Sequence, residues 1–386
     1  MATKKSRKAK GKRARPPKRE WAILVYIAAD NNLSDAGLKD IQEMCAAGSA
    51  PDLYVGVEID TYGEHTGSIR YEITEPDFTG KAHRTVIERL AEKNTGDPAV
   101  LKAFIKWGDK RYPAQNRLLV VGGHGVGFRS PVRDIAYDDF GSSLNMAEME
   151  GALKGAGIKG KNKLQILGFD ACLMNMIEIA HHFKDQAEII VGSQHTEPGD
   201  GWPYREVLNK AKKAKKAKKP KNADALADGI VKDYIKDYRK RGIKNVTQSA
   251  VQTKKTEAVI KALDTLGNAL CANFAQIKKD LKSVRIQTQT FYMADYIDLI
   301  HFSEQLIRKI NIPAIAKAAQ KVIDAAKAAI ISNKKYGSMV ANANGLSVWF
   351  PPTSRIYFKN RAKYMELHCN DSKKFGWTTF LDKYHQ

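Results

Sequence analysis

The stretch LLVVGGHG (residues 118–125) is a short apolar run that ends abruptly in glycines and a histidine. A second run of the same kind, LQILGFDAC (residues 164–172), ends in an aspartate and a cysteine. Short apolar runs bounded by turn residues are typical of strands buried on both faces of a parallel sheet. Ligands bind at the carboxyl ends of such strands, so the two runs place His124 and Cys172 at one functional edge.

The rest of the N-terminal half alternates strand and helix signals. Ser34 and the motifs Asp97-Pro98 and Asn145-x-x-Glu148 are typical of helix starts, and we expect a further helix to begin at Cys172. Further apolar runs predict strands at residues 21–29, 53–59, 68–73 and 188–192. This alternation predicts an α/β fold, with a mostly parallel sheet and helices on both faces.

The C-terminal half is more helical. Apolar residues recur with the helical period at 226–238, 263–281 and 315–330, and short strands are expected at 247–252 and 345–350. The predicted organisation is a disordered basic arm (1–19), an α/β core (20–205), a Lys-rich loop (206–222) and a helical part (223–386) that completes the same domain.

Charge is concentrated in two segments of the 386 residues. The chain is 43% hydrophobic, which excludes wholesale disorder, and its formal net charge is +22. The first nineteen residues hold ten Lys and Arg, and residues 210–221 hold eight Lys; without them the remainder carries +4. The basic arm lacks the apolar core of a secretory signal. The lack of such a signal in this arm, together with four scattered cysteines, predicts a reducing, cytoplasmic location. The cysteines are Cys45, Cys172, Cys271 and Cys369.

The two strand ends carry the elements of nucleophilic catalysis. A helix start at Cys172 would lower the pKa of its thiol, and His124 would accept and return a proton. The backbone N–H groups of Gly125 and Cys172 could bind a developing oxyanion. Each residue alone is more typical of a buried thiol or a solvated imidazole, but the pair at neighbouring strand ends favours catalysis.

No metal site is expected from the sequence. His181 and His182 lie on a predicted helix without Cys or carboxylate partners at ligand spacing, so we interpret them as part of a helix face. The five Trp residues show no alternation with basic residues that would favour a single-stranded nucleic-acid platform.

The His-Gly and Asp-Ala-Cys blocks resemble the paired signature of caspase-like cysteine peptidases, and more narrowly the clostripain family. The matching stretches are VYIAADNNL (25–33), GGHGVGF (122–128), DACLMNMIE (170–178), EPGDGWPY (197–204) and GLSVWFPP (345–352). The resemblance is strong over residues 21–205, weaker over 245–352 and absent from the two basic segments.

This resemblance implies a caspase-like fold and a cysteine endopeptidase that cleaves after Arg or Lys through a thioester acyl-enzyme. Cys172 would be the nucleophile and His124 the acid/base. Asp170 and Asp200 match acidic positions of the specificity pocket, although Asp200 in Gly-Asp-Gly is also typical of a turn. Calcium dependence is known in the family, but no EF-hand-like run is present, and no cofactor is expected to be required.

A second function class remains open. An inactive peptidase fold could bind nucleic acid or another polyanion through its two basic segments. The intact His124/Cys172 pair favours the enzyme, whose partners would be proteins or peptides with Arg or Lys before the cut. We expect a monomer without a membrane span that trims its own basic arm and Lys-rich segment.

Overall fold

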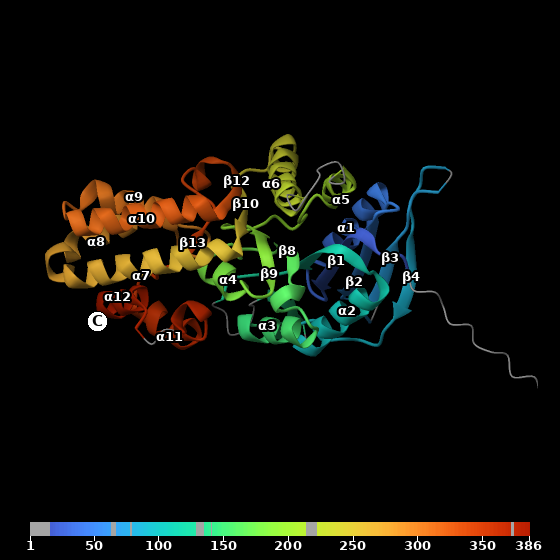
Figure 1. Cartoon of the computed structure of the whole chain (residues 1–386), viewed down its shortest axis with the longest axis horizontal. Coiled ribbons are helices and arrows are strands. Elements are labelled where there is room, and N and C mark those ends of the chain that lie inside the picture. Colours follow the sequence, from blue (N-terminus) through green and yellow to red (C-terminus); the bar gives the residue numbers. More distant parts are fainter. Residues whose placement is uncertain are drawn as a thin grey trace, which may run out of the picture.

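One large sheet forms the centre of the molecule (Figure 1). A computed structural model describes residues 16–62, 67–77, 79–128, 135–139, 141–213, 222–371 and 374–386. Within these residues, nine strands pair in the order β12-β10-β9-β8-β5-β1-β2-β3-β4. Their bounds are β1 (Arg19–Ala29), β2 (Leu53–Thr61), β3 (Ile69–Ile73), β4 (Arg84–Arg89), β5 (Ala114–Gly122), β8 (Leu164–Asp170), β9 (Ala187–Gly192), β10 (Val246–Gln252) and β12 (Ile330–Tyr336).

The inner strands of this sheet are parallel and its margins are antiparallel. Strand β1 pairs in parallel with β2 and β5, and β8 pairs in parallel with β5 and β9. Strands β3 and β4 on one side, and β10 and β12 on the other, add antiparallel edges. The predicted mostly parallel α/β sheet is therefore confirmed. Strands β3 and β10 match the strands expected at residues 68–73 and 247–252, whereas the apolar pattern did not reveal the outermost strands β4 and β12.

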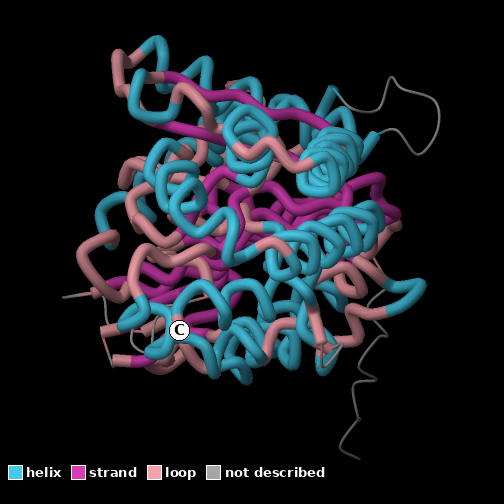
Figure 2. The backbone as a smooth tube through the Cα atoms, turned by 90° about the vertical axis from the view of Figure 1, so that its left-hand side faces the viewer, coloured by secondary structure: helices cyan, strands magenta, loops and turns pink. Residues whose placement is uncertain are grey.

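Helices cover both faces of the sheet, as Figure 2 shows from the side. Along β1, Ile23, Val25 and Ile27 enter one core, and the alternate residues enter the other, because successive strand side chains point to opposite faces. The first core is closed by α1 (Ser34–Ala47), α5 (Tyr204–Lys213) and α6 (Asn222–Lys240). The second is closed by α2 (Pro98–Arg111), α3 (Met146–Gly155), α4 (Ile177–His182) and the C-terminal helices.

The C-terminal half shares this second core. Its elements are α7 (Thr256–Ala272), α8 (Phe274–Gln287), β11 (Tyr296–Asp298), α9 (Leu299–Lys309), α10 (Pro313–Ala329), β13 (Ser347–Trp349), α11 (Ser354–Met365) and α12 (Gly376–His385). A small antiparallel pair joins β11 to β13, and another joins β6 (Ile135–Asp138) to β7 (Ser142–Leu144). The buried Glu178 of α4 accepts a hydrogen bond from the Trp349 N–H at 2.8 Å, which ties the two halves together.

The predicted helix starts give mixed outcomes. Asp97 caps α2, and Asn145 and Glu148 form the full capping box of α3, as expected. The cap assigned to Ser34 is wrong, because Leu33 precedes α1 without a side-chain cap. The Ser34 hydroxyl instead donates to the carbonyl of Ala29, since the chain turns sharply after β1.

The limits of the two basic segments also differ from the prediction. Residues 1–15 and 214–221 lie outside the described residues. The basic arm does not extend to residue 19, because Arg19 begins β1 and donates to the carbonyls of Ala50 and Leu53. The loop expected from residue 206 is helical as far as Lys213, because Val207, Leu208 and Ala211 form a buried stripe of α5. Among the described helices, none has the length and apolar character needed to cross a membrane.

Candidate functional site

Two neighbouring strands deliver His124 and Cys172 to one cavity. Strands β5 and β8 pair in parallel with Gly122 opposite Asp170, so the chain leaves both strands at the same level of the sheet. His124 and Cys172, which follow within two residues of these positions, both line a cavity of about 430 Å³. The sequence-based expectation that these two residues share one edge is therefore confirmed.

The loops carrying the two residues are packed backbone against backbone. A Cβ atom placed on Gly125 would lie 2.8 Å from the carbonyl oxygen of Cys172 and 3.3 Å from its amide nitrogen. Only a glycine permits this approach. The amides of Gly125 and Cys172, expected to form an oxyanion hole, are thus on adjoining segments, and their role in binding an oxyanion stays a prediction.

Cys172 does not begin a helix, which corrects the sequence-based expectation. Leu173 adopts a left-handed conformation with φ of 65°, and its N–H donates to the carbonyl of His195, so α4 starts only at Ile177. Burial raises the pKa of the Cys172 thiol, despite the hydrogen bond that the Glu197 N–H donates to Sγ at 3.2 Å. Burial therefore favours the protonated thiol, and no helix terminus lies at Cys172 to stabilise a thiolate.

Asn32 orients the imidazole of His124. Its Oδ1 lies 2.8 Å from Nε2 of His124, and the ring of Tyr137 lies edge-on at 6.3 Å between centroids. If Nε2–H donates to Asn32, Nδ1 keeps its lone pair and is the nitrogen able to accept a proton. Asn32 follows β1, so a third strand end contributes to the site.

Three carboxyl groups form one wall of the cavity. Asp170 is the last residue of β8, Asp40 comes from α1 and Glu197 from the loop after β9, and all three line the cavity. Asp170 accepts hydrogen bonds from the Trp202 N–H at 3.2 Å and from the Tyr204 hydroxyl at 2.8 Å.

The proximity of these carboxyl groups perturbs their titration. Burial, followed by the charge of Asp170, raises the pKa values of Asp40 and Glu197, and burial raises the pKa of Asp170 itself. A cationic group entering the cavity would stabilise the ionised carboxylates and lower these pKa values. The wall is therefore chemically suited to a guanidinium or an ammonium group.

Asp200 lies apart from this wall. Its carboxylate forms ion pairs with Lys39, at 2.6 Å, and with Arg241, and it is not among the residues that line the cavity. The role assigned to it in a specificity pocket stays a prediction, but its two cationic partners already neutralise its charge. Asp40 and Glu197 occupy the positions beside Asp170 instead.

Asn32, Asp40 and Glu197 were not identified from the sequence. Asp40 could have been found by helical spacing, because it shares the buried face of α1 with Gly37, Ile41 and Met44. An acidic residue on such a face is a signal of function or of a buried partner. Asn32 and Glu197 both belong to stretches that carried the family resemblance, but neither has a local pattern that specifies its contacts.

A mostly parallel sheet that presents a histidine and a cysteine from neighbouring strand ends defines the caspase-like fold class. The chain belongs to the clostripain family, whose model matches residues 25–384. The sequence is similar to clostripain of Hathewaya histolytica, with 28% identity over 246 residues. That match covers 55% of this chain and 44% of the relative, so this chain spans less than half of that protein.

Solved structures agree on the fold. An inactive zymogen C11 protease from Parabacteroides distasonis superimposes with a TM-score of 0.72 and 19% identity, covering 96% of this chain and 99% of that one. A secreted C11 cysteine protease from Bacteroides thetaiotaomicron, bound to an irreversible peptide inhibitor, superimposes with a TM-score of 0.67 and 18% identity. This match covers 92% of this chain and 99% of that one. At these identities the likeness establishes the architecture alone.

Replacing Asn32 with alanine tests whether it positions His124. Without this acceptor the imidazole loses the hydrogen bond that Asn32 supplies, so we expect alkylation of Cys172 by iodoacetamide to slow about tenfold. The melting temperature should not change, because the Asn32 side chain is exposed. Labelling is measured by peptide mass spectrometry. Asn32→Asp keeps the acceptor and should retain the wild-type rate; an unchanged rate in Asn32→Ala would exclude the positioning role.

Proposed function

We propose that this protein is a cysteine endopeptidase that hydrolyses peptide bonds after Arg or Lys. The observation that carries this proposal is the single cavity that holds His124 and Cys172 beside a wall of Asp40, Asp170 and Glu197. Membership of the clostripain family supports the reaction class. The acidic wall supports the preference for a basic residue before the cut, because buried carboxylates are unfavourable unless a cation compensates their charge.

In the proposed reaction, His124 takes the proton of the half-buried Cys172 thiol as sulfur attacks the substrate carbonyl carbon. The resulting oxyanion lies near the amides of Gly125 and Cys172, whose segments adjoin. Collapse of this intermediate releases the amine, which receives its proton from His124, and leaves a thioester on Cys172. Water, deprotonated by His124, then hydrolyses the thioester and restores the thiol.

Recognition of the basic side chain is assigned to Asp170 and Asp40. Asp170 is held by the Trp202 N–H and the Tyr204 hydroxyl, which fix its orientation while one face remains toward the cavity. A bound guanidinium would form charge-assisted hydrogen bonds with this carboxylate and relieve its repulsion with Asp40. No cofactor is required by this scheme. The polyanion-binding alternative rests on basic segments that lie mostly outside the described residues.

The proposed dyad is tested with Cys172→Ala and His124→Ala. Cys172→Ala should abolish cleavage of a fluorogenic peptide with Arg before the cut, because no acyl-enzyme can form. His124→Ala should reduce kcat roughly 100-fold or more, because proton transfer is lost. Circular dichroism should show unchanged folding in both variants. Wild-type turnover by either folded variant would refute the mechanism.

The specificity wall is tested by comparing Asp40→Asn with Asp200→Asn. Asp40→Asn should lower the ratio of kcat/KM for an Arg peptide to that for its uncharged citrulline analogue by roughly 30-fold or more, as expected for a lost charged contact. Asp200→Asn serves as the matched control and should leave the ratio within about threefold, because its carboxylate is paired at the surface. If Asp200→Asn lowered the ratio and Asp40→Asn did not, Asp200 rather than Asp40 would be the specificity residue.

Self-cleavage follows if the proposed specificity is correct. Lys210, Lys212 and Lys213 belong to helix α5, and Lys212 donates a hydrogen bond to the carbonyl of Ala47. Cleavage after these lysines therefore requires local unfolding of α5. We expect cuts after lysines beyond Lys213 and in the basic arm. Intact-mass spectrometry should find them in the wild type and not in Cys172→Ala; a single uncut chain in an active sample would refute this expectation.

A further inference from the structure

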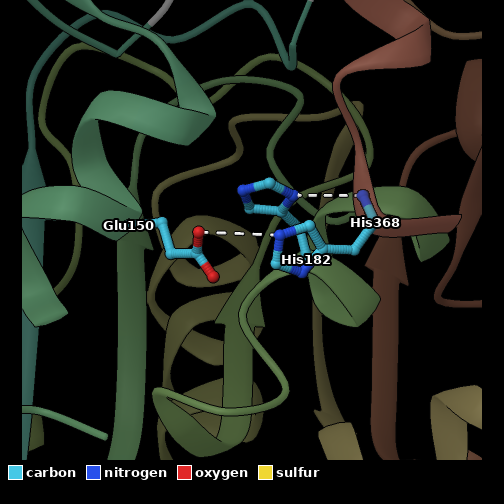
Figure 3. A group of neighbouring side chains, drawn as sticks. All are labelled: Glu150, His182 and His368. Atoms are coloured by element: carbon cyan, nitrogen blue, oxygen red, sulfur yellow. Dashed lines mark hydrogen bonds and ion pairs between the residues drawn. The ribbon is translucent and has the colours of Figure 1, made fainter. Parts of the chain in front are cut away.

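Three residues able to bind a metal meet away from the proposed catalytic cavity. Glu150 lies on α3, His182 is the last residue of α4, and His368 begins the short 3₁₀ helix η5 (His368–Asn370). Each contributes one candidate ligand atom, and these atoms lie within 4.8 Å of one another. Figure 3 shows the two imidazoles one above the other with the carboxylate of Glu150 facing them.

His182 is the most deeply buried member of this cluster. The residue is 1% exposed, and within the described residues its Nε2 has no hydrogen-bond partner closer than 3.5 Å, although the backbone of Met146 interacts with the ring. Leaving an imidazole nitrogen without a partner in the interior is unfavourable, so such an atom indicates a missing ligand.

Glu150 and His368 complete the donor set. Glu150 is 7% exposed, and its Oε2 lies 3.6 Å from Nε2 of His368. The rings of His182 and His368 lie 4.2 Å apart between centroids. The His368 side chain is one-quarter exposed, which gives an ion a path from solvent to the buried members.

The chemistry of these donors selects the class of metal. Two imidazole nitrogens and one carboxylate oxygen suit Zn²⁺ and related transition metals, whereas Ca²⁺ and Mg²⁺ prefer sites made entirely of oxygen. We propose that Glu150, His182 and His368 bind one zinc-class divalent ion, with a water molecule in the fourth position. The site is distinct from the cavity and does not depend on the proposed peptidase activity.

Metal binding requires specific local adjustments. Nε2 of His182 can bind a metal only when the ring proton is on Nδ1, so the long 3.4 Å contact between Nδ1 and the His368 N–H must open. Lys154, which lies 2.8 Å from Oε1 of Glu150, competes for the carboxylate. Tetrahedral zinc bonds of about 2.0–2.1 Å also require the three ligand atoms to converge to roughly 3.3 Å from one another.

The consequence of binding would be a cross-link between distant parts of the chain. Glu150 and His182 belong to helices that cover the sheet, whereas His368 belongs to the C-terminal segment. An ion that binds only the folded chain raises its stability by mass action. Zinc would therefore link the C-terminal segment to α3 and α4.

The test uses the full chain in a Cys172→Ala background, because a thiol and an imidazole in the cavity could themselves bind zinc. After treatment with a chelator, isothermal titration with ZnCl₂ should give one ion per chain. The melting temperature should rise by about 3 °C at a free zinc concentration of about 100 times Kd. Co²⁺ should give visible absorption bands typical of nitrogen and oxygen ligands.

Variants separate this site from adventitious binding. His368→Ala and Glu150→Gln should each lose at least tenfold in zinc affinity and most of the thermal shift, while melting normally without zinc. His83→Ala removes an exposed histidine outside the cluster and is the control. It should bind zinc with the same affinity as the Cys172→Ala parent. Lys154→Ala should bind several-fold more tightly, because it frees Glu150. Unchanged binding in both ligand variants, or no binding by the parent chain, would overturn the proposal.

Discussion

The parallel pairing of β5 with β8 is the constraint on which the candidate site depends. It sets Gly122 opposite Asp170, so the two loops that follow emerge at the same level and meet backbone to backbone at Gly125. A shift of one residue in this register would displace the two loops relative to each other along the strand direction and move His124 away from Cys172. The apolar strands therefore fix both the core and the geometry of the proposed dyad.

The cavity has an electrostatic cost that the surrounding structure offsets. Asp40, Asp170 and Glu197 are all held where burial raises their pKa values. Hydrogen bonds from Trp202, Tyr204 and Gln248 stabilise two of them, and the charge of Asp170 still contributes to the raised pKa values of Asp40 and Glu197. An arrangement of this kind is expected where function, rather than stability, requires the charges.

The C-terminal half supports the segment that carries Cys172 rather than supplying the proposed dyad. Asn175, three residues beyond Cys172, donates to the carbonyl of Gly345, and the Ser347 N–H donates to the carbonyl of Asn175. Glu178 accepts from the Trp349 N–H. These contacts replace the helix that the sequence led us to expect directly after β8, and they explain why a stretch so distant in sequence belongs to the same domain.

The sequence by itself determined the central strands, the caps of α2 and α3, and the placement of His124 and Cys172 at one edge, because strand burial and capping are written in local patterns. It could not specify the antiparallel edges β4 and β12, which are polar and exposed in part. Only the tertiary structure brought Asp40 beside Asp170, Asn32 to His124, and Glu150 to His182 and His368. Those contacts join separate elements, and their distances arise from packing that no short stretch of sequence encodes.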